Sequence, residues 1–141
     1  MPTIAQTDNE ITHCFDVMSE LRPHLYREDF LEKVRTLQQG GYQLLFLEQD
    51  SEVVAVAGFR IAMNLFMGKH LYVDDLVTAD KHRSRGYGET LINWLRDLAL
   101  KENCSYLHLD SGTHREQAHK FYFAQGFAIK SFHFSEKLSA N

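Results

Sequence analysis

Apolar residues recur along the first forty positions at the three- and four-residue spacing of amphipathic helices. In the segment TDNEITHCFDVMSEL, either Thr7 or Asp8 can cap the helix and Pro23 ends it; the apolar positions are Ile11, Cys14, Phe15 and Met18. The segment REDFLEKVRTLQQGG repeats this spacing with Phe30, Leu31, Val34 and Leu37. Gly40 and Gly41 then end the pattern. A short strand at residues 3–6 followed by two helices is therefore predicted.

The middle and the end of the chain alternate between strand-like and helix-like patterns. Residues 42–66 are two apolar runs around a Gln-Asp-Ser turn, which predicts a hairpin, and residues 70–80 predict another strand. A long helix follows, with a stripe formed by Leu91, Ile92, Leu95, Leu98 and Ala99. Residues 105–112 predict a strand, residues 114–127 a short helix, and AIKSFHFSEKL a final strand or hairpin. The order β-α-α-β-β-β-α-β-α-β predicts an α/β fold with a mixed sheet flanked by helices.

Composition narrows the class of protein without naming a function. The 141 residues are 44% hydrophobic and 24% charged, with no repeat or linker, so we expect one domain spanning 1–141. The net charge of −4 argues against a nucleic-acid partner. Neither a signal peptide nor a membrane-spanning run is visible. Cys14 and Cys104 are far apart and are expected to be reduced thiols of a cytoplasmic protein.

The stretch HRSRGYGETLINWL combines arginines, glycines and the start of a helix. A loop between a strand and a helix presents free backbone N–H groups, and the helix dipole favours an anion there. Gly86 and Gly88 allow close approach of the backbone, while Lys81, Arg83 and Arg85 add positive charge. The stretch matches neither GxxxxGK[ST] nor GxGxxG. A pyrophosphate site of another kind is therefore predicted.

Two motifs together resemble the Gcn5-related N-acetyltransferases (GNAT), in the form of a small single-domain bacterial member. The spacing Arg83-x-x-Gly86-x-Gly88 is similar to the coenzyme A loop of that family. The stretch AHKFYFAQGF is similar to its second signature, A-x-x-F-Y-x-x-x-G-F, at all five fixed positions. The resemblance runs from Leu44 to the C-terminus. It implies a mostly antiparallel GNAT sheet with a splayed central strand pair, and transfer of an acetyl group from acetyl-CoA to a primary amine.

The resemblance also assigns residues to the acetyl-CoA site. It implies that the end of the strand before the loop contacts the pantetheine arm, that the loop holds the pyrophosphate, and that polar groups further along complete the site. The expected residues are Leu76, Val77, Thr78, Arg83, Ser84, Arg85, Gly86, Tyr87, Gly88, Glu89, Thr90, Ser111, His119 and Tyr122.

Acetyl transfer needs a proton for the leaving thiolate, a donor to the carbonyl oxygen and a neutral amine. The family resemblance implies that Tyr122 is the acid, that the Val77 N–H is the donor, and that Asp74 is the base, directly or through water. Strand alternation is expected to put Asp74 and Asp75 on opposite faces. Asp74, Asp75 and Asp110 are the expected substrate-binding residues, and together with Glu89 they form an acidic set that would suit a cationic acceptor.

Several alternatives stay open on the sequence. The acceptor is a polyamine-like small molecule or a peptide or protein amino group, and the motifs do not decide between them. A non-catalytic acyl-CoA-binding or regulatory domain would keep the same loop. No metal site is expected, because HExxH is absent. A homodimer is compatible with the apolar last segment, and neither nucleic acid nor membrane is an expected partner.

Overall fold

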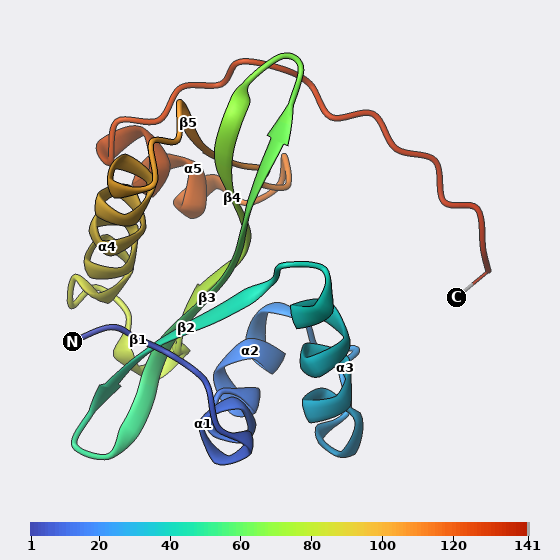
Figure 1. Ribbon diagram of the computed structural model, residues 1–141. Coiled ribbons are helices and arrows are strands. Elements are labelled where there is room, and N and C mark those ends of the chain that lie inside the picture. The colour runs from blue at the N-terminus through green and yellow to red at the C-terminus, as the bar shows by residue number, and fades with distance from the viewer. Residues whose placement is uncertain (141) are drawn as a thin grey trace. The chain divides into compact units, whose positions relative to one another are not determined.

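The computed structural model describes residues 1–140 and places a five-stranded sheet at the centre of the segment Met1–Leu109 (Figure 1). The strands follow chain order: β1 (Thr3–Ile4), β2 (Gln43–Gln49), β3 (Glu52–Asn64), β4 (Gly68–Thr78) and β5 (Tyr106–Leu109). All neighbours are antiparallel except β4 and β5, which are parallel. The predicted α/β class and mostly antiparallel mixed sheet are confirmed.

Helices cover both faces of this sheet. One face carries α1 (Asp8–His13), α2 (Phe15–Leu21) and α3 (Arg27–Gln39), and the other carries α4 (Tyr87–Lys101), which follows a short 3₁₀ turn at Asp80–His82. The single helix predicted for residues 7–21 is wrong, because the chain turns at Cys14. The Cys14 N–H bonds to the Ile11 carbonyl, three residues back, and the tightened turn starts a second helix.

Thr7 is the N-cap of α1, which resolves the choice between Thr7 and Asp8. Its hydroxyl accepts from the Glu10 N–H at 3.1 Å, and the Glu10 carboxylate accepts from the Thr7 N–H at 2.9 Å. This reciprocal pair satisfies two amides that the helix itself leaves open. These hydrogen bonds to backbone N–H groups hold the pKa of Glu10 below its usual range.

Strand alternation separates the core into two layers. The layer under α1–α3 contains Ile11, Phe15, Met18, Phe30, Val34, Leu44, Phe46, Val56 and Val77. The layer under α4 contains Leu45, Ala57, Phe59, Leu71, Val73, Leu91, Leu95 and Ala99. Each fully buried aliphatic or aromatic side chain contributes about 1.5–3 kcal/mol relative to an exposed one. The two layers therefore fix the sheet between the helices.

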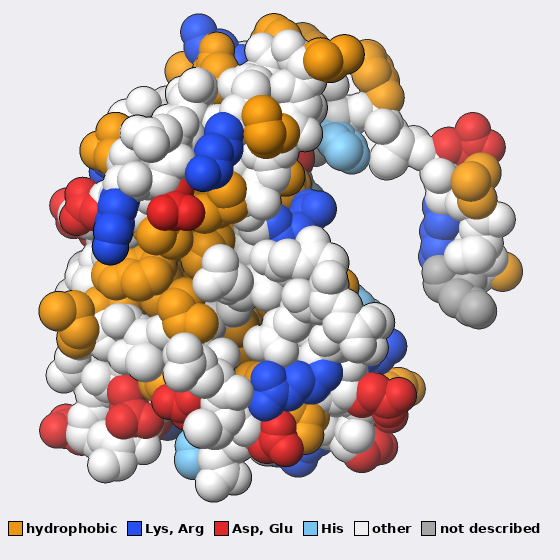
Figure 2. All heavy atoms as spheres, viewed as in Figure 1, with side chains coloured by type: hydrophobic (Ala, Val, Ile, Leu, Met, Phe, Trp, Pro, Cys, Tyr) orange, Lys and Arg blue, Asp and Glu red, His pale blue; other side chains and the backbone are white. Residues whose placement is uncertain are grey.

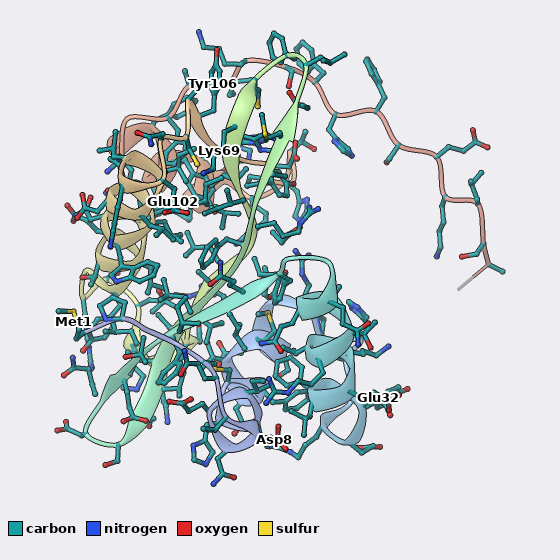
Figure 3. The ribbon with its side chains drawn as sticks, in the orientation of Figure 1. Met1, Asp8, Glu32, Lys69, Glu102 and Tyr106 are labelled. Atoms are coloured by element: carbon teal, nitrogen blue, oxygen red, sulfur yellow. The ribbon has the colours of Figure 1, made fainter. Side chains whose placement is uncertain are left out.

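The outer faces of α1–α3 are mostly polar, although Leu37 of the predicted apolar stripe is 51% exposed. Over α1–α3, acidic and basic side chains intermingle on the face shown in Figure 2. Glu32 points outward from α3, and Asp8 lies at the start of α1 (Figure 3). No helix in the described part of the chain is long and apolar enough to cross a membrane.

The second compact unit begins at Asp110 and contains one helix, α5 (Glu116–Ala124). Gly126, with φ of 94°, follows the helix as predicted. The final strand predicted for residues 128–138 is wrong: residues 128–140 form neither helix nor strand. An alternating pattern makes a strand only where another strand supplies hydrogen bonds, and none in residues 1–140 pairs with this segment.

Candidate active site

The N-terminus of α4 is open for an anion. Gly86 is its N-cap, has φ of 83°, and supplies no capping side chain. The first hydrogen bond of the helix runs from the Thr90 N–H to the Gly86 carbonyl at 3.0 Å. The amides of Tyr87, Gly88 and Glu89 therefore precede the helical ladder and lie at the positive end of the helix dipole.

The segment before this N-terminus is held in place by Glu52 at the start of β3. Lys81 Nζ lies 3.1 Å from Glu52 Oε1, and His82 Nε2 lies 2.8 Å from Glu52 Oε2. These two hydrogen bonds hold the pKa of Glu52 below its usual range. The other ring nitrogen of His82 lies 3.1 Å from Arg85 Nη1. Ser84 has a left-handed φ of 64°, which is an uncommon conformation for a residue with a side chain.

The basic side chains of the loop remain accessible to a ligand. Arg83 pairs with Asp80 at 3.3 Å, and the Arg83 side chain is 63% exposed. Such an exposed pair contributes little to stability, since water screens it. Arg83 is therefore free to exchange Asp80 for a phosphate group at small energetic cost.

The end of β4 has a free edge next to this loop. The ladder between β4 and β5 runs from His70 and Tyr106 to Val73 and Leu109, and β5 ends there. β4 continues to Thr78 while pairing only with β3. β4 therefore continues beyond the end of β5, and within residues 1–140 no strand pairs with its edge there. Divergence of the two strands, which the family resemblance implies, stays a prediction.

The register of β3 and β4 decides which amides point to the free edge. The Ala79 N–H donates to the Val54 carbonyl at 2.8 Å, across β3. Direction alternates along an antiparallel ladder, so the Val77 N–H also points toward β3, where Val56 lies opposite. The N–H groups of Leu76 and Thr78 point the other way. The register therefore contradicts a free Val77 amide and leaves the two flanking amides available.

Asp74 and Asp75 lie on the same face of the sheet, so the prediction that they lie on opposite faces is wrong. Gly58 pairs with Asp75, but the next β3 residue, Phe59, pairs with Val73. Asp74 is thus the extra residue of a β-bulge. A bulge shifts the alternation by one position, which turns both carboxylates toward the α1–α3 side.

Both carboxylates line a cavity of about 550 Å³ together with Arg22, Tyr42 and Arg60. Arg60 donates two hydrogen bonds of 2.8 Å to Asp74, one to each carboxylate oxygen. Asp75 accepts from Arg22 Nε at 2.9 Å and from the Tyr42 hydroxyl at 2.8 Å. Each acidic group therefore already has a cationic partner.

Tyr42 reaches Asp75 only because residue 58 is glycine. A Cβ on Gly58 would lie 1.8 Å from the Tyr42 hydroxyl oxygen and 2.6 Å from Asp75 Oδ2. Burial and the neighbouring Asp75 carboxylate raise the pKa of Tyr42 well above its usual range. Tyr42 therefore stays a hydrogen-bond donor at every physiological pH.

The second unit contains the remaining expected residues. Tyr122 packs edge-on against Phe121 and Phe127, and burial raises the pKa of the Tyr122 hydroxyl. His119 Nε2 lies 2.7 Å from the Gly112 carbonyl oxygen. The Ser111 hydroxyl is buried and has no hydrogen-bond partner within residues 1–140.

The unpartnered Ser111 hydroxyl is the kind of group that a ligand would satisfy, because an unpaired buried hydroxyl is costly. Asp110 Oδ1 lies 3.7 Å from His133 Nδ1 within the same unit. Residues 1–140 contain no group of three or more His, Cys, Asp or Glu side chains arranged to hold a metal ion.

Sequence reasoning missed the three partners of the acidic pair. Arg22, Tyr42 and Arg60 come from α2's C-cap, from the residue before β2 and from β3. The clue was Gly58 inside an otherwise β-branched and aromatic run, because a glycine within a strand often marks a bulge or a close approach. The glycine indicates a bulge or a close contact, but it does not identify the side chains that lie against it.

Comparison with known proteins gives a consistent assignment. A family model described as the acetyltransferase (GNAT) family matches residues 5–127. The chain is 35% identical over 127 residues to an uncharacterized N-acetyltransferase, YhdJ, of Bacillus subtilis (strain 168), with 89% of each chain covered.

Solved structures of low sequence identity share the fold. A ribosomal-protein-alanine N-acetyltransferase from Brucella melitensis biovar Abortus 2308 superimposes with a TM-score of 0.83 at 18% identity, covering 98% of this chain and 99% of that one. The aminoglycoside N-acetyltransferase AAC(6')-Iy in complex with CoA has a TM-score of 0.82 at 16% identity, covering 99% and 96%.

Proposed function

The chain belongs to the acetyltransferase (GNAT) family, and on that premise we propose that it transfers the acetyl group of acetyl-CoA directly to a primary amine within a ternary complex. The observation that carries the proposal is the uncapped N-terminus of α4 beside the free end of β4. The backbone amides at the N-terminus of α4 can bind the pyrophosphate of acetyl-CoA. Those at the end of β4 can bind its pantetheine arm. We also propose that residues 1–141 act as one catalytic domain, because the matched family model spans both units.

Acetyl-CoA, when bound, supplies an acetyl group activated as a thioester. The segment Arg83–Thr90 would hold its pyrophosphate through backbone amides at the start of α4, with Arg83 and Arg85 adding charge. Gly86 begins the helix in a left-handed conformation and provides no side chain that would cap these amides. Ser111 and His119 are proposed as polar contacts to the pantetheine arm, and the unpartnered Ser111 hydroxyl supports that role.

The free edge of β4 is proposed to stabilise negative charge on the acetyl carbonyl oxygen. A backbone N–H is a fixed dipole that needs no reorganisation during the reaction. Leu76 and Thr78 present such N–H groups at this edge, while the Val77 amide faces β3. We therefore assign the donor to one of the two flanking amides and leave Val77 as the residue that holds them in register.

Tyr122 and Asp74 are the residues proposed to transfer protons. Tyr122 is proposed to donate a proton to the departing thiolate, which requires the phenol to be protonated at neutral pH. The raised pKa of Tyr122 supports this requirement. Asp74 is proposed to accept the proton of the amine, directly or through a water molecule, while Arg60 holds the carboxylate in position.

A non-catalytic acyl-CoA-binding domain is the alternative, and turnover separates the two. Purified protein with acetyl-CoA is assayed for thiol release against polyamines, aminoglycosides, amino acids and peptides with free N-termini. We expect amine-dependent release and an N-acetylated product identified by mass spectrometry. Tight binding of acetyl-CoA without release in the presence of any amine would favour the alternative.

A further inference from the structure

The cavity beside β4 is lined by equal numbers of positively and negatively charged side chains. Each carboxylate oxygen accepts a hydrogen bond, whereas some of the arginine N–H groups donate none. Asp74 and Asp75 contribute two negative charges, and Arg22 and Arg60 contribute two positive charges. Tyr42 lines the same cavity and is neutral. A polycationic acceptor would bring its charges into a space that has no net negative charge to receive them.

Each oxygen of the two carboxylates already accepts one hydrogen bond, which leaves each of them room for one more. Both oxygens of Asp74 accept from Arg60, and the two oxygens of Asp75 accept from Arg22 and Tyr42. A cationic ligand would have to share these oxygens with guanidinium groups that are already in place. Like charges brought together in this way repel each other.

The donor atoms of the two arginines are not all engaged. Arg60 uses Nε and Nη2 on Asp74, and Arg22 uses Nε on Asp75 and Nη2 on the Asp74 carbonyl. The Nη1 group of each arginine has no hydrogen-bond partner within residues 1–140. The side chains are 43% and 46% exposed, so both can reach a ligand in the cavity. Their planar N–H groups match a carboxylate.

We propose that the acceptor is a small amine that also carries a carboxylate, as an amino acid does, and that Arg22 and Arg60 bind that carboxylate. The proposal rests on the proposed acetyl transfer and names the substrate class for the same site. Two anchored aspartates would hold the arginines in position, and the carboxylate would complete their hydrogen bonds. A volume of about 550 Å³ accommodates a molecule of amino-acid size.

The test compares amines that differ only in the acidic group. Each amino acid of a panel is paired with its own carboxamide, and spermidine and 1,5-diaminopentane represent cationic acceptors without a carboxylate. The amine of a carboxamide is less basic and therefore more often neutral at neutral pH. This difference favours the carboxamide chemically, so a preference for the acid must come from the protein.

The expected result is a kcat/KM for the acid that exceeds that of the carboxamide by about tenfold to a hundredfold, because the carboxamide leaves charged donors unpaired. Arg60→Gln should bring this ratio close to one. Arg27→Gln is the matched control, since Arg27 also pairs with an aspartate, Asp16, but lies on the exposed surface outside the cavity. It should keep the ratio of the wild type.

Further variants keep the result interpretable. Arg60→Gln leaves the Asp74 carboxylate without its partner, so the double variant Arg60→Gln/Asp74→Asn removes both charges of the pair and guards against a folding defect. Because Asp74 is also the proposed base, this variant is compared by calorimetric binding of the acid and the carboxamide and not by turnover. A circular dichroism spectrum and unfolding midpoint accompany each variant. The proposal is overturned if diamines or carboxamides are the better acceptors, or if Arg22→Gln and Arg60→Gln both retain the preference for the acid.

Failure of the proposed function has a different signature. If no amine gives thiol release, isothermal titration calorimetry of the same amino acids and carboxamides with the full chain tests whether the cavity binds a carboxylate, independently of turnover. Binding of the acids that weakens in Arg60→Gln supports a carboxylate site even without turnover. Equal or absent binding of acids and carboxamides overturns it.

Discussion

The Tyr42 hydroxyl lies 2.8 Å from the Asp75 carboxylate, directly over the backbone of β3 where residue 58 has no side chain. This contact joins the residue before β2 to the bulged part of β4. It also fixes one wall of the proposed acceptor cavity. The free energy of unfolding of a variant at residue 58 tests whether the contact stabilises the fold.

Gly58→Ala should destabilise the protein by about 1–3 kcal/mol, since the new methyl group overlaps the Tyr42 hydroxyl and the Asp75 carboxylate. Urea unfolding measures the effect. Gly40→Ala is the control, because its Cβ would meet no atom closer than 3.6 Å and should change stability by less than about 0.5 kcal/mol. Equal stability of the two variants would contradict the packing described for Tyr42.

Gly86→Ala should weaken acetyl-CoA binding about tenfold, roughly the loss of one charge-assisted hydrogen bond. Alanine avoids the left-handed φ of 83° and would rotate the amides that follow. Gly68→Ala carries similar strain, with φ of 68° in the β3–β4 turn and no crowding. Gly68→Ala should destabilise the protein about as much as Gly86→Ala does, but it should keep the wild-type affinity for acetyl-CoA. Titration calorimetry with acetyl-CoA measures the affinity of both variants. Unchanged affinity of Gly86→Ala would remove the loop from the proposed site.

Tyr122→Phe should lower kcat by about tenfold to a hundredfold while leaving the KM for acetyl-CoA nearly unchanged. Burial raises the pKa of Tyr122 above its ordinary 10.0, so the wild-type rate should not fall on the alkaline side until that pH is exceeded. Tyr26→Phe, which removes the hydroxyl of an exposed tyrosine, is the control. If Tyr122→Phe turns over at the wild-type rate, another group supplies the proton.

Asp74→Asn should lower kcat by about a hundredfold if the carboxylate accepts the amine proton. In Asp74→Ala, which leaves room for a replacement carboxylate, added formate should restore part of the rate. Asp97→Asn, on the exposed side of α4, is the matched control. A normal kcat for Asp74→Asn would assign the base to a water chain, whereas a low rate of Asp74→Ala that formate does not restore would indicate that Asp74 acts only by holding Arg60.

Cys14 should make stability fall as the pH rises above 9.0. Burial raises the pKa of its thiol from 9.0 to about 12, so the folded state keeps a proton that the unfolded chain releases. This contribution is fully present below pH 9.0 and declines as the pH approaches about 12. Unfolding by urea at a series of pH values should show a steeper decline for the wild type than for Cys14→Ala. Parallel curves would contradict this account.

Much of the fold follows from periodicity, because burial on one face imposes a repeat that the sequence must show. The hairpin of β2 and β3, the strand β4 and the stripe of α4 were predicted for this reason. The turn at Cys14 was missed, since a change from an α-helical to a tighter turn does not alter the apolar spacing. The segment after Phe127 was predicted as a strand from its pattern alone, although pairing also needs a partner strand.

The loop was predictable and the acceptor cavity was not, for a physical reason. Residues 83–90 are contiguous, so their spacing alone indicates a backbone arrangement. The cavity is assembled from segments that are far apart in sequence, as the contact of Arg22 with Asp75 illustrates. A single extra residue at the bulge then reverses the face on which Asp75 lies, and no alternation rule includes that residue.

The central claim is acetyl transfer to an amine, and the most direct measurement follows both products in one reaction. Protein, isotopically labelled acetyl-CoA and the best amine of the panel are mixed, and mass spectrometry quantifies free CoA and acetylated amine. We predict that the two products appear in equal amounts, that the label is on the amine, and that no label remains on the protein. Free CoA without acetylated amine, or acetyl-CoA that binds and stays intact with every amine, would contradict the account.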